Sequence, residues 1–175
     1  MKLKGKKVVI LSGPDYEDME LQYPLYRLKE EGAEVVVAGI GAESYKGKKG
    51  YPVTVDAQIT DLNAKDFDAV VIPGGYAPDH MRRSEELLAF VREIHDQGKT
   101  VAAICHAPWV AVSAGILKGR RVTCVPAIKD DVMNAGADYV DEPVVVDGNL
   151  ITSRRPDDLP VFLPAIIESI SRQDA

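Results

Sequence analysis

Short apolar runs recur along the chain, and most are separated by segments with helical periodicity. Four runs are apolar on both faces, which is typical of strands buried inside a parallel sheet. The predicted buried strands are KVVIL at 7–11, EVVVAGI at 34–40, DAVVI at 68–72 and VAAI at 101–104. Each run is followed by glycine, proline or another turn residue within a few positions.

The intervening segments predict helices, several of which end at a glycine. The predicted helices are 18–31, 85–97, 108–115, 130–135 and 157–172. In the first of them Leu21, Tyr26 and Leu28 supply the apolar positions, and Pro24 predicts a kink or a late start. Shorter strands are expected at 51–55, 121–125, 139–140, 144–146 and 150–152, with a hairpin turn at 147–149.

This alternation predicts an α/β fold with an open, mostly parallel central sheet and helices on both faces. In such sheets the functional crevice lies beyond the carboxyl ends of the strands. Three loops meet at that edge: 13–17, 74–79 and 105–106. With no repeat, linker or low-complexity tract, residues 1–175 are expected to form one domain.

Composition narrows the class of protein. The net charge of -6 argues against a nucleic-acid backbone as the main partner. No apolar run approaches the ~20 residues of a membrane span, and no signal peptide is visible, so a cytoplasmic protein without a membrane partner is expected. Cys105 and Cys124 could pair, but two free thiols are the better expectation in a cytosolic chain. No cluster of residues shows metal-ligand spacing.

The strongest candidate for chemistry is Cys105. It stands between the predicted strand 101–104 and a helix that has Pro108 in its first turn. A side chain at such a turn is exposed, and the helix N–H groups favour a thiolate and a developing oxyanion. The alternative is a small buried core residue, which is what most cysteines are. We therefore predict that Cys105 is a nucleophile, whereas Cys124 is expected to be structural.

Other residues at the same edge could assist. His106 adjoins the cysteine, but neighbours at a turn often point apart, so it could equally pack. Gly74 and Gly75 let the backbone approach a ligand, and a Gly75 N–H could bind an oxyanion; the plain alternative is a tight turn. Asp79 and His80 could orient His106 or simply be solvated.

Glu17 and Glu20 follow the first strand, and either could reach the crevice or be an ordinary first-turn acid. A carboxylate close to Cys105 would raise the pKa of the thiol. A close pair therefore makes sense only if the carboxyl group is protonated and donates a hydrogen bond to the thiolate.

Five segments in order along the chain resemble the PfpI (intracellular protease I) family. They are PDYEDMEL, VVIPGGYAPD, AAICHAPW, KDDVMNAGA and VVVDGNLITSRRPDDLP. This family belongs to the DJ/PfpI group of the class I glutamine amidotransferase-like superfamily. The resemblance implies a flavodoxin-like three-layer sandwich, a reactive cysteine on a nucleophile elbow, and a homo-oligomer, either a dimer or a hexamer.

By resemblance, Cys105 is the family cysteine, His106 the following histidine, and Glu17, rather than Glu20, the protonated glutamate bonded to the cysteine. In family proteases a neighbouring subunit supplies the acid of a Cys-His-acid triad. Here that position is Asp79, where the family has glutamate, and this departure weakens the implied triad. Arg155 stands where relatives commonly have glycine, and it could narrow the entrance.

The family's activities include several chemistries, and residue matching does not choose among them. We expect a cysteine-dependent hydrolase or lyase that handles reactive dicarbonyls as a glutathione-independent glyoxalase, or their protein adducts as a deglycase. No cofactor is needed for either reaction. The alternatives are an intracellular cysteine peptidase that uses Cys105, His106 and Asp79, and a non-enzymatic redox sensor or stress chaperone.

Overall fold

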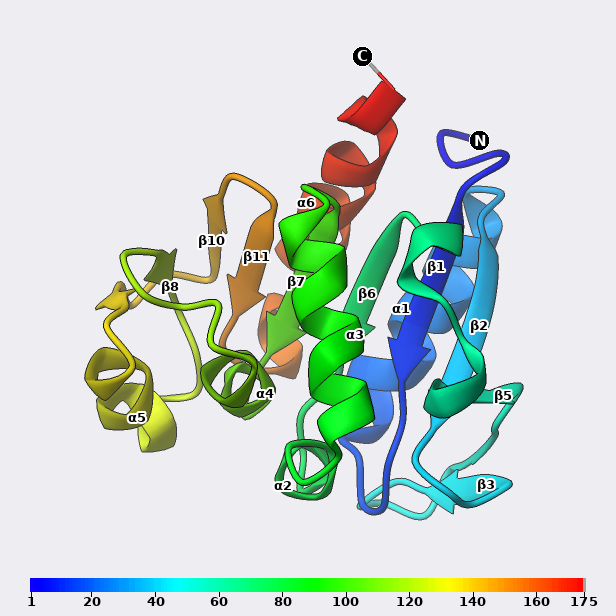
Figure 1. Cartoon of the computed structure of the whole chain (residues 1–175), viewed down its shortest axis with the longest axis horizontal. Helices are drawn as coiled ribbons and strands as arrows, with labels where there is room; N and C mark the ends of the chain where they lie inside the picture. Colours follow the sequence, from blue (N-terminus) through cyan, green and yellow to red (C-terminus); the bar gives the residue numbers. More distant parts are fainter. Residues whose placement is uncertain (175) are drawn as a thin grey trace.

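The computed structural model describes residues 1–174. Within them seven strands form a central sheet in the order β10-β11-β7-β6-β1-β2-β5 (Figure 1). Their bounds are β1 Lys7–Leu11, β2 Glu34–Gly39, β5 Ala57–Gln58, β6 Ala69–Ile72, β7 Thr100–Ile104, β10 Val144–Asp147 and β11 Leu150–Ser153. All neighbours pair in parallel except β10 with β11, so the predicted mostly parallel sheet is confirmed.

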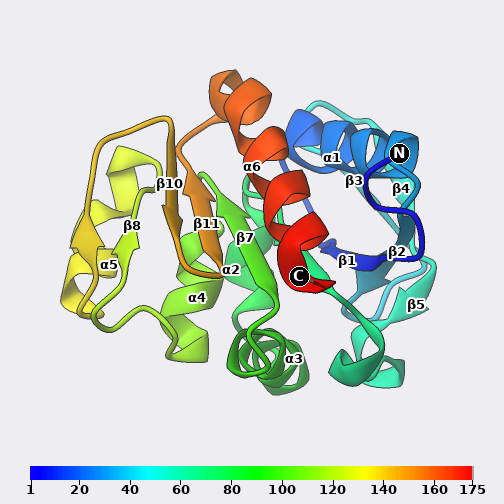
Figure 2. The ribbon, with the colours of Figure 1, turned by 90° about the horizontal axis from the view of Figure 1, so that it is seen from above.

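Helices cover both faces of this sheet, as Figure 2 shows: α1 and α6 lie on one face, and α3 and α4 on the other. The helices are α1 Asp18–Glu30, α2 Ala77–Met81, α3 Glu85–Asp96, α4 Pro108–Ala114, α5 Lys129–Asn134 and α6 Leu159–Ser171. Short 3-10 turns occupy Ile59–Asp61, Ala64–Asp66, Pro126–Ile128, Pro156–Asp158 and Arg172–Asp174. This is the expected flavodoxin-like sandwich.

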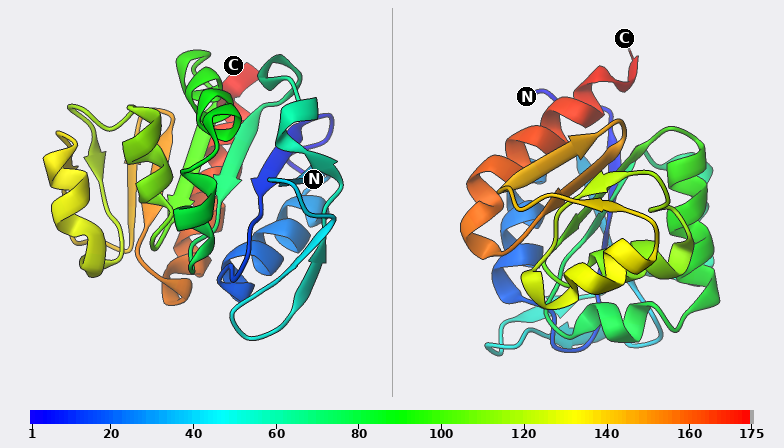
Figure 3. Two further views of the ribbon diagram at one scale, coloured as in Figure 1. Left: turned by 60° about the horizontal axis from the view of Figure 1, so that its bottom comes forward. Right: turned by 90° about the vertical axis from the view of Figure 1, so that its left-hand side faces the viewer.

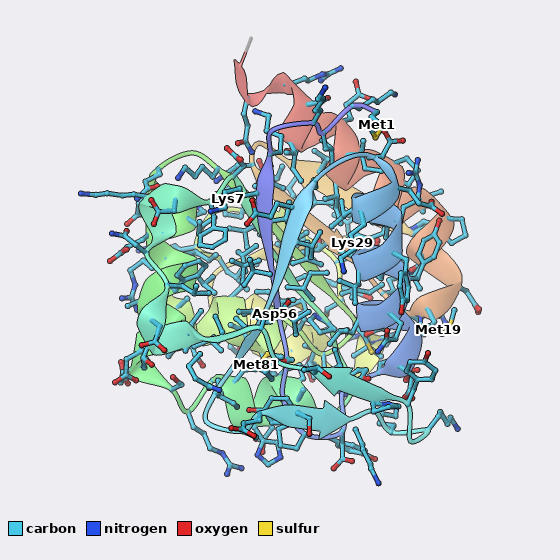
Figure 4. All side chains as sticks on the ribbon, turned by 90° about the vertical axis from the view of Figure 1, so that its right-hand side faces the viewer. Met1, Lys7, Met19, Lys29, Asp56 and Met81 are labelled. Carbon is cyan, nitrogen blue, oxygen red and sulfur yellow. The ribbon has the colours of Figure 1, made fainter. Side chains whose placement is uncertain are left out.

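Two small strand pairs lie outside the main sheet. β8 Arg121–Val122 pairs with β9 Asp138–Tyr139 next to α5, at the edge of the molecule beyond β10 (Figure 3). β3 Ser44–Lys46 and β4 Pro52–Thr54 form an antiparallel hairpin. Figure 4 shows this hairpin at one end of the molecule, near the start of α1 where Met19 is labelled.

The core follows the hydrophobic pattern closely. Every residue of β6 and β7 is buried, and α3 turns Leu87, Leu88, Val91 and Ile94 inward, as predicted. Helix α1 differs from the prediction in one residue: Tyr26 is 55% exposed. The buried apolar face of α1 instead contains Leu21, Pro24, Leu25 and Leu28, because these positions recur at helical spacing and Tyr26 lies off that stripe.

The parallel strands of the central sheet share one carboxyl edge. The arrowheads of β1, β6 and β7 point to the same end of the molecule in Figure 1, where α2 and the β3–β4 hairpin also lie. Both chain termini lie at the opposite end. The loops that sequence analysis singled out therefore meet on one side. Within residues 1–174, no helix is both long enough and apolar enough to cross a bilayer.

Candidate active site

Cys105 occupies a strained turn between β7 and α4. Its φ of 67° lies in the left-handed region, which costs a non-glycine residue about 1–2 kcal/mol. The surrounding backbone holds it there: the Cys105 N–H donates to the Ser153 carbonyl over 3.0 Å, and the Cys105 carbonyl accepts from Val125 N–H over 3.0 Å. The side chain is only partly buried, and Cys105 is a free thiol, as is the buried Cys124. The elbow predicted at Cys105 is therefore present.

Two backbone N–H groups, those of Gly75 and His106, donate hydrogen bonds to the Cys105 sulfur and lower the pKa of its thiol. Gly75 has a φ of 82°, and a Cβ built on it would lie 2.4 Å from the Glu17 nitrogen, so only glycine fits there. Gly74 has a different task. Its N–H donates to Glu20 Oε1 over 2.8 Å, so of the two glycines only Gly75 has an N–H directed at the sulfur.

Glu20 is the carboxyl group beside the thiol. Its side chain is fully buried, and it lies within hydrogen-bonding reach of the Cys105 side chain. Gly74 lies between the side chains of Glu20 and Cys105. A Cβ built on Gly74 would lie 2.6 Å from Glu20 Oε1 and 2.8 Å from Cys105 Cβ, so only glycine fits at this position. Glu20 Oε2 is buried and makes no hydrogen bond of ordinary length within the described residues, so it remains available to the thiol beside it.

Burial raises the pKa of Glu20 to about 8, so this carboxyl group holds a proton at neutral pH. Burial and then the Glu20 charge raise the pKa of Cys105 to about 12. Once Glu20 carries its proton, that charge is absent and the thiol pKa falls. Sequence analysis required that a carboxyl group close to the cysteine be protonated, and Glu20 meets this requirement.

Glu17 does not occupy that position, contrary to the match made from sequence. It is the N-cap residue of α1 with extended backbone angles, and its Oε2 lies 2.9 Å from Lys48 Nζ. Glu20 stands one turn further into the helix, which carries its side chain inward beneath Gly74. The two glutamates differ in direction because they are three residues apart at the helix start. The side chain of the cap residue Glu17 turns toward Lys48, whereas that of Glu20 points into the core.

His106 lies next to the sulfur. Its Nδ1 is 3.4 Å from Cys105 Sγ, closer than the sequence argument about neighbouring side chains implied. Burial and the charge of Lys48 lower the pKa of His106, so the ring is neutral at neutral pH and able to accept a proton. The ring meets Trp109 edge-on at 5.3 Å between centroids, and Trp109 Nε1 donates to Asp131 Oδ2 over 2.8 Å. These contacts fix the orientation of the imidazole.

The remaining predicted residues lie further out. Asp79 is on α2, is partly exposed, and pairs with Arg83 one turn along the same segment. Among the contacts found for the described residues, none joins His106 to Asp79 or to His80. Arg155 is exposed in the loop before α6, and its neighbour Arg154 is held by Asp158 and Asp141.

Lys48 is a site residue that sequence analysis missed. It lies in the turn between β3 and β4, its ammonium is 5.7 Å from the centroid of the Tyr76 ring, and its charge lowers the pKa of both Cys105 and His106. The only signal in the sequence was the composition of 41–50, a stretch rich in turn residues and lysines that is typical of a solvated surface. Within residues 1–174, no group of three or more His, Cys, Asp or Glu side chains could hold a metal ion.

The buried Glu20 should make stability depend on pH. Its pKa is about 8 in the native state against an ordinary 4.5, so between these values the native state binds more protons than the unfolded state. Stability contributed by the protonated carboxyl group is therefore lost as pH rises through that window, by at most about 1.4 kcal/mol per pH unit. Glu20→Gln lacks this titration. Urea unfolding of both proteins across the window should show wild type losing stability relative to the variant, whereas a constant difference would contradict the raised pKa.

Comparison with known proteins identifies the family. The sequence profile described as the DJ-1/PfpI family matches residues 6–169, nearly the whole chain. The chain belongs to the DJ-1/PfpI family. A deglycase of Pyrococcus abyssi is 48% identical over 162 residues, covering 93% of this chain and 98% of the relative. The deglycase PfpI of Pyrococcus furiosus is 44% identical over the same shares of both chains.

Solved structures of the DJ-1/PfpI family share the fold. A two-domain protein of Anabaena variabilis, with a DJ-1/ThiJ/PfpI-like and a ferritin-like domain, superposes with a TM-score of 0.92 at 52% identity. The match covers 93% of this chain and 47% of that one. DJ-1beta of Drosophila melanogaster gives a TM-score of 0.88 at 34% identity, covering 97% and 92% of the two chains. The resemblance noted from five sequence segments is thereby confirmed.

Proposed function

We propose that this protein is a cysteine-dependent enzyme that acts on reactive 2-oxo aldehydes or on the adducts that they form with amines and thiols. The observation that carries the proposal is the pairing of Cys105 with a protonated Glu20 at a strained elbow, beneath the N–H groups of Gly75 and His106. The deglycase names of relatives that are 44–48% identical over nearly their full length support the same substrate class.

The first step joins substrate and sulfur. The Cys105 thiolate adds to the aldehyde carbon, a C–S bond forms, and the electron pair of the C=O bond moves to oxygen. The N–H groups of Gly75 and His106, which already donate to Sγ, stabilise the charge on sulfur and then on that oxygen. Glu20 gives its proton to the oxygen, so the product is a neutral hemithioacetal beside an ionised carboxylate.

The second step is an internal redox shift. The Glu20 carboxylate takes the proton from the former aldehyde carbon and returns it to the neighbouring carbonyl carbon. The hydroxyl proton of the hemithioacetal moves to the neighbouring oxygen, so the thioester of a 2-hydroxy acid is left on Cys105. Water hydrolyses the thioester: its oxygen joins the acyl carbon, the sulfur leaves as the thiolate, one proton returns to Glu20 and the other leaves to solvent through His106. A 2-hydroxy carboxylate, the Cys105 thiolate and protonated Glu20 result. His106, neutral and 3.4 Å from the sulfur, is placed to accept the proton of that water.

An adduct enters the same sequence. The thiolate displaces the amine or thiol from the carbon that carries the hydroxyl group, and Glu20 gives its proton to the departing amine or thiol. The hemithioacetal formed is the one described above. One site therefore serves free dicarbonyls and their adducts, so the same residues support both the glyoxalase and the deglycase reaction.

A substrate panel tests the proposal and separates it from the peptidase alternative. Wild-type protein should convert methylglyoxal to lactate and release the amine from a methylglyoxal–lysine adduct, both followed by NMR. Unstructured peptides should stay intact, because within the described residues no acidic side chain contacts His106 to complete a triad. Peptide cleavage without lactate formation would favour the peptidase with a triad completed by a neighbouring subunit. Inertness towards all three substrates would leave the redox sensor or chaperone.

A further inference from the structure

Lys48 brings a positive charge to the rim of the site. Its Nζ lies 2.9 Å from Glu17 Oε2 and 5.7 Å from the centroid of the Tyr76 ring. Glu17 immediately precedes α1, and Tyr76 directly follows Gly75. The ammonium group therefore lies between the start of α1, the helix that carries Glu20, and the loop that supplies the Gly75 N–H.

The backbone around Lys48 is held firmly. The Asp18 carboxylate accepts the N–H of Lys49 over 2.9 Å and the N–H of Tyr51 over 3.0 Å. A Cβ on Gly47 would lie 2.4 Å from the Asp18 carboxyl carbon, so the turn is packed directly against that group. The Lys48 N–H itself donates to the Tyr16 carbonyl over 2.8 Å. The turn thus fixes the position of the Lys48 backbone. The reaction described above assigns no role to Lys48.

The side chain has room to change partner. Lys48 is 34% exposed, and its ion pair with Glu17, which is 15% exposed, lies at the protein surface. The pair is partly open to solvent on the Lys48 side, so an anion that enters from the rim can compete with Glu17 for the ammonium group. The charge of Lys48 also acts on both Cys105 and His106.

We propose that Lys48 is a specificity-determining residue. Its ammonium group exchanges Glu17 for a negatively charged oxygen of the substrate next to the reacting carbon. The site therefore favours aldehydes that carry a negative charge at that oxygen or develop one there during the reaction. The preferred class comprises 2-oxo aldehydes and aldehydes that carry a carboxylate. For a 2-oxo aldehyde this inference rests on the proposed function. When Glu20 takes the proton from the hemithioacetal carbon, the electron pair left behind forms a C=C bond and charges the second oxygen. Lys48 stabilises that charge until the proton returns to carbon.

The test compares two alkylating reagents that differ in charge at the same thiol. The rate constant for Cys105 with iodoacetate, divided by that with iodoacetamide, reports the local charge, because the fraction of thiolate cancels in the ratio. Peptide mass spectrometry assigns the label to Cys105 and away from the buried Cys124. Lys49 provides a matched control, since it is the adjacent exposed lysine and its substitution removes the same charge.

Lys48→Met should lower the ratio roughly tenfold, as expected for a unit charge several ångströms from the carboxylate. Lys49→Met should change it by less than about twofold, because its charge is further away and screened. Lys48→Arg should keep the wild-type ratio, and Glu17→Gln should raise it by freeing Lys48. An unchanged ratio in Lys48→Met, or an equal fall in Lys49→Met, would overturn the proposal.

Turnover is measured separately on the same proteins. Suppose that the iodoacetate-to-iodoacetamide ratio changes as expected but neither the wild-type protein nor any variant converts methylglyoxal. The proposed function then fails, whereas the anion preference that Lys48 confers stands. If methylglyoxal is converted and the ratio ignores Lys48, the proposed function stands and the role of Lys48 is overturned.

Discussion

Cys105→Ser should lower methylglyoxal turnover on the order of 10³-fold or more, because a serine hydroxyl does not ionise where the thiol does. Serine has nearly the volume of cysteine and the same backbone needs, so it fits the elbow at a φ of 67°. The N–H groups of Gly75 and His106 and the carboxyl group of Glu20 remain in place in this variant. The loss would therefore report the nucleophile itself, measured as kcat by lactate formation.

Cys124→Ala is the matched control for that variant. Cys124 is the second free thiol and is fully buried, so its substitution removes one sulfur without removing the elbow. It should retain turnover per folded molecule while losing some stability through a small cavity. Equal loss in both variants would show a general disturbance of the fold, and full turnover in Cys105→Ser would exclude the covalent mechanism.

Glu20→Gln should lower turnover roughly 10²-fold, which is typical of removing a general acid–base group. Glutamine keeps an acceptor for the Gly74 N–H and a donor for the thiolate, so the electrostatic support of Cys105 persists. It cannot give up and recover a proton. Alkylation of Cys105 by iodoacetamide should therefore stay close to the wild-type rate while lactate formation falls.

Glu17→Gln is the informative comparison, since resemblance alone favoured Glu17 for this role. Its carboxylate faces Lys48, so the substitution should change turnover only a few-fold. If Glu17→Gln proves as damaging as Glu20→Gln, the assignment of the buried proton to Glu20 is wrong. If Glu20→Gln slows alkylation and turnover equally, Glu20 supports the thiolate but moves no proton.

The features predicted well from sequence are those that local patterns determine. The apolar run 101–104, the cysteine and Pro108 lie within eight residues, and together they specify a strand, an exposed turn and a helix start. Gly75 was predictable for the same reason: a glycine in the loop just after a buried strand of a parallel sheet falls at the carboxyl edge. The two donors at the sulfur follow from that topology.

The partner of the cysteine could not be settled in this way. Glu17 and Glu20 are three residues apart at a helix start, and helical spacing places either one close to the buried face of Leu21, Pro24 and Leu28. What separates them is that Glu17 is the non-helical cap, and a boundary is uncertain by a residue or two from sequence.

Lys48 illustrates a different limit. Its position depends on Asp18 binding the turn between β3 and β4, a contact between residues about thirty positions apart. No periodicity or motif within the turn encodes that contact, so the basic stretch looked like ordinary surface. Residues that reach a site from a neighbouring hairpin become visible only once the tertiary structure is known.

The central claim is that Cys105 works beside a carboxyl group that holds its proton at neutral pH. Infrared difference spectroscopy of wild type against Glu20→Gln, at about pH 7, tests it most directly. The account predicts the carbonyl band of a protonated, buried carboxylic acid in wild type that the variant lacks, because the pKa of Glu20 is about 8. A carboxylate band in its place at that pH would contradict the claim.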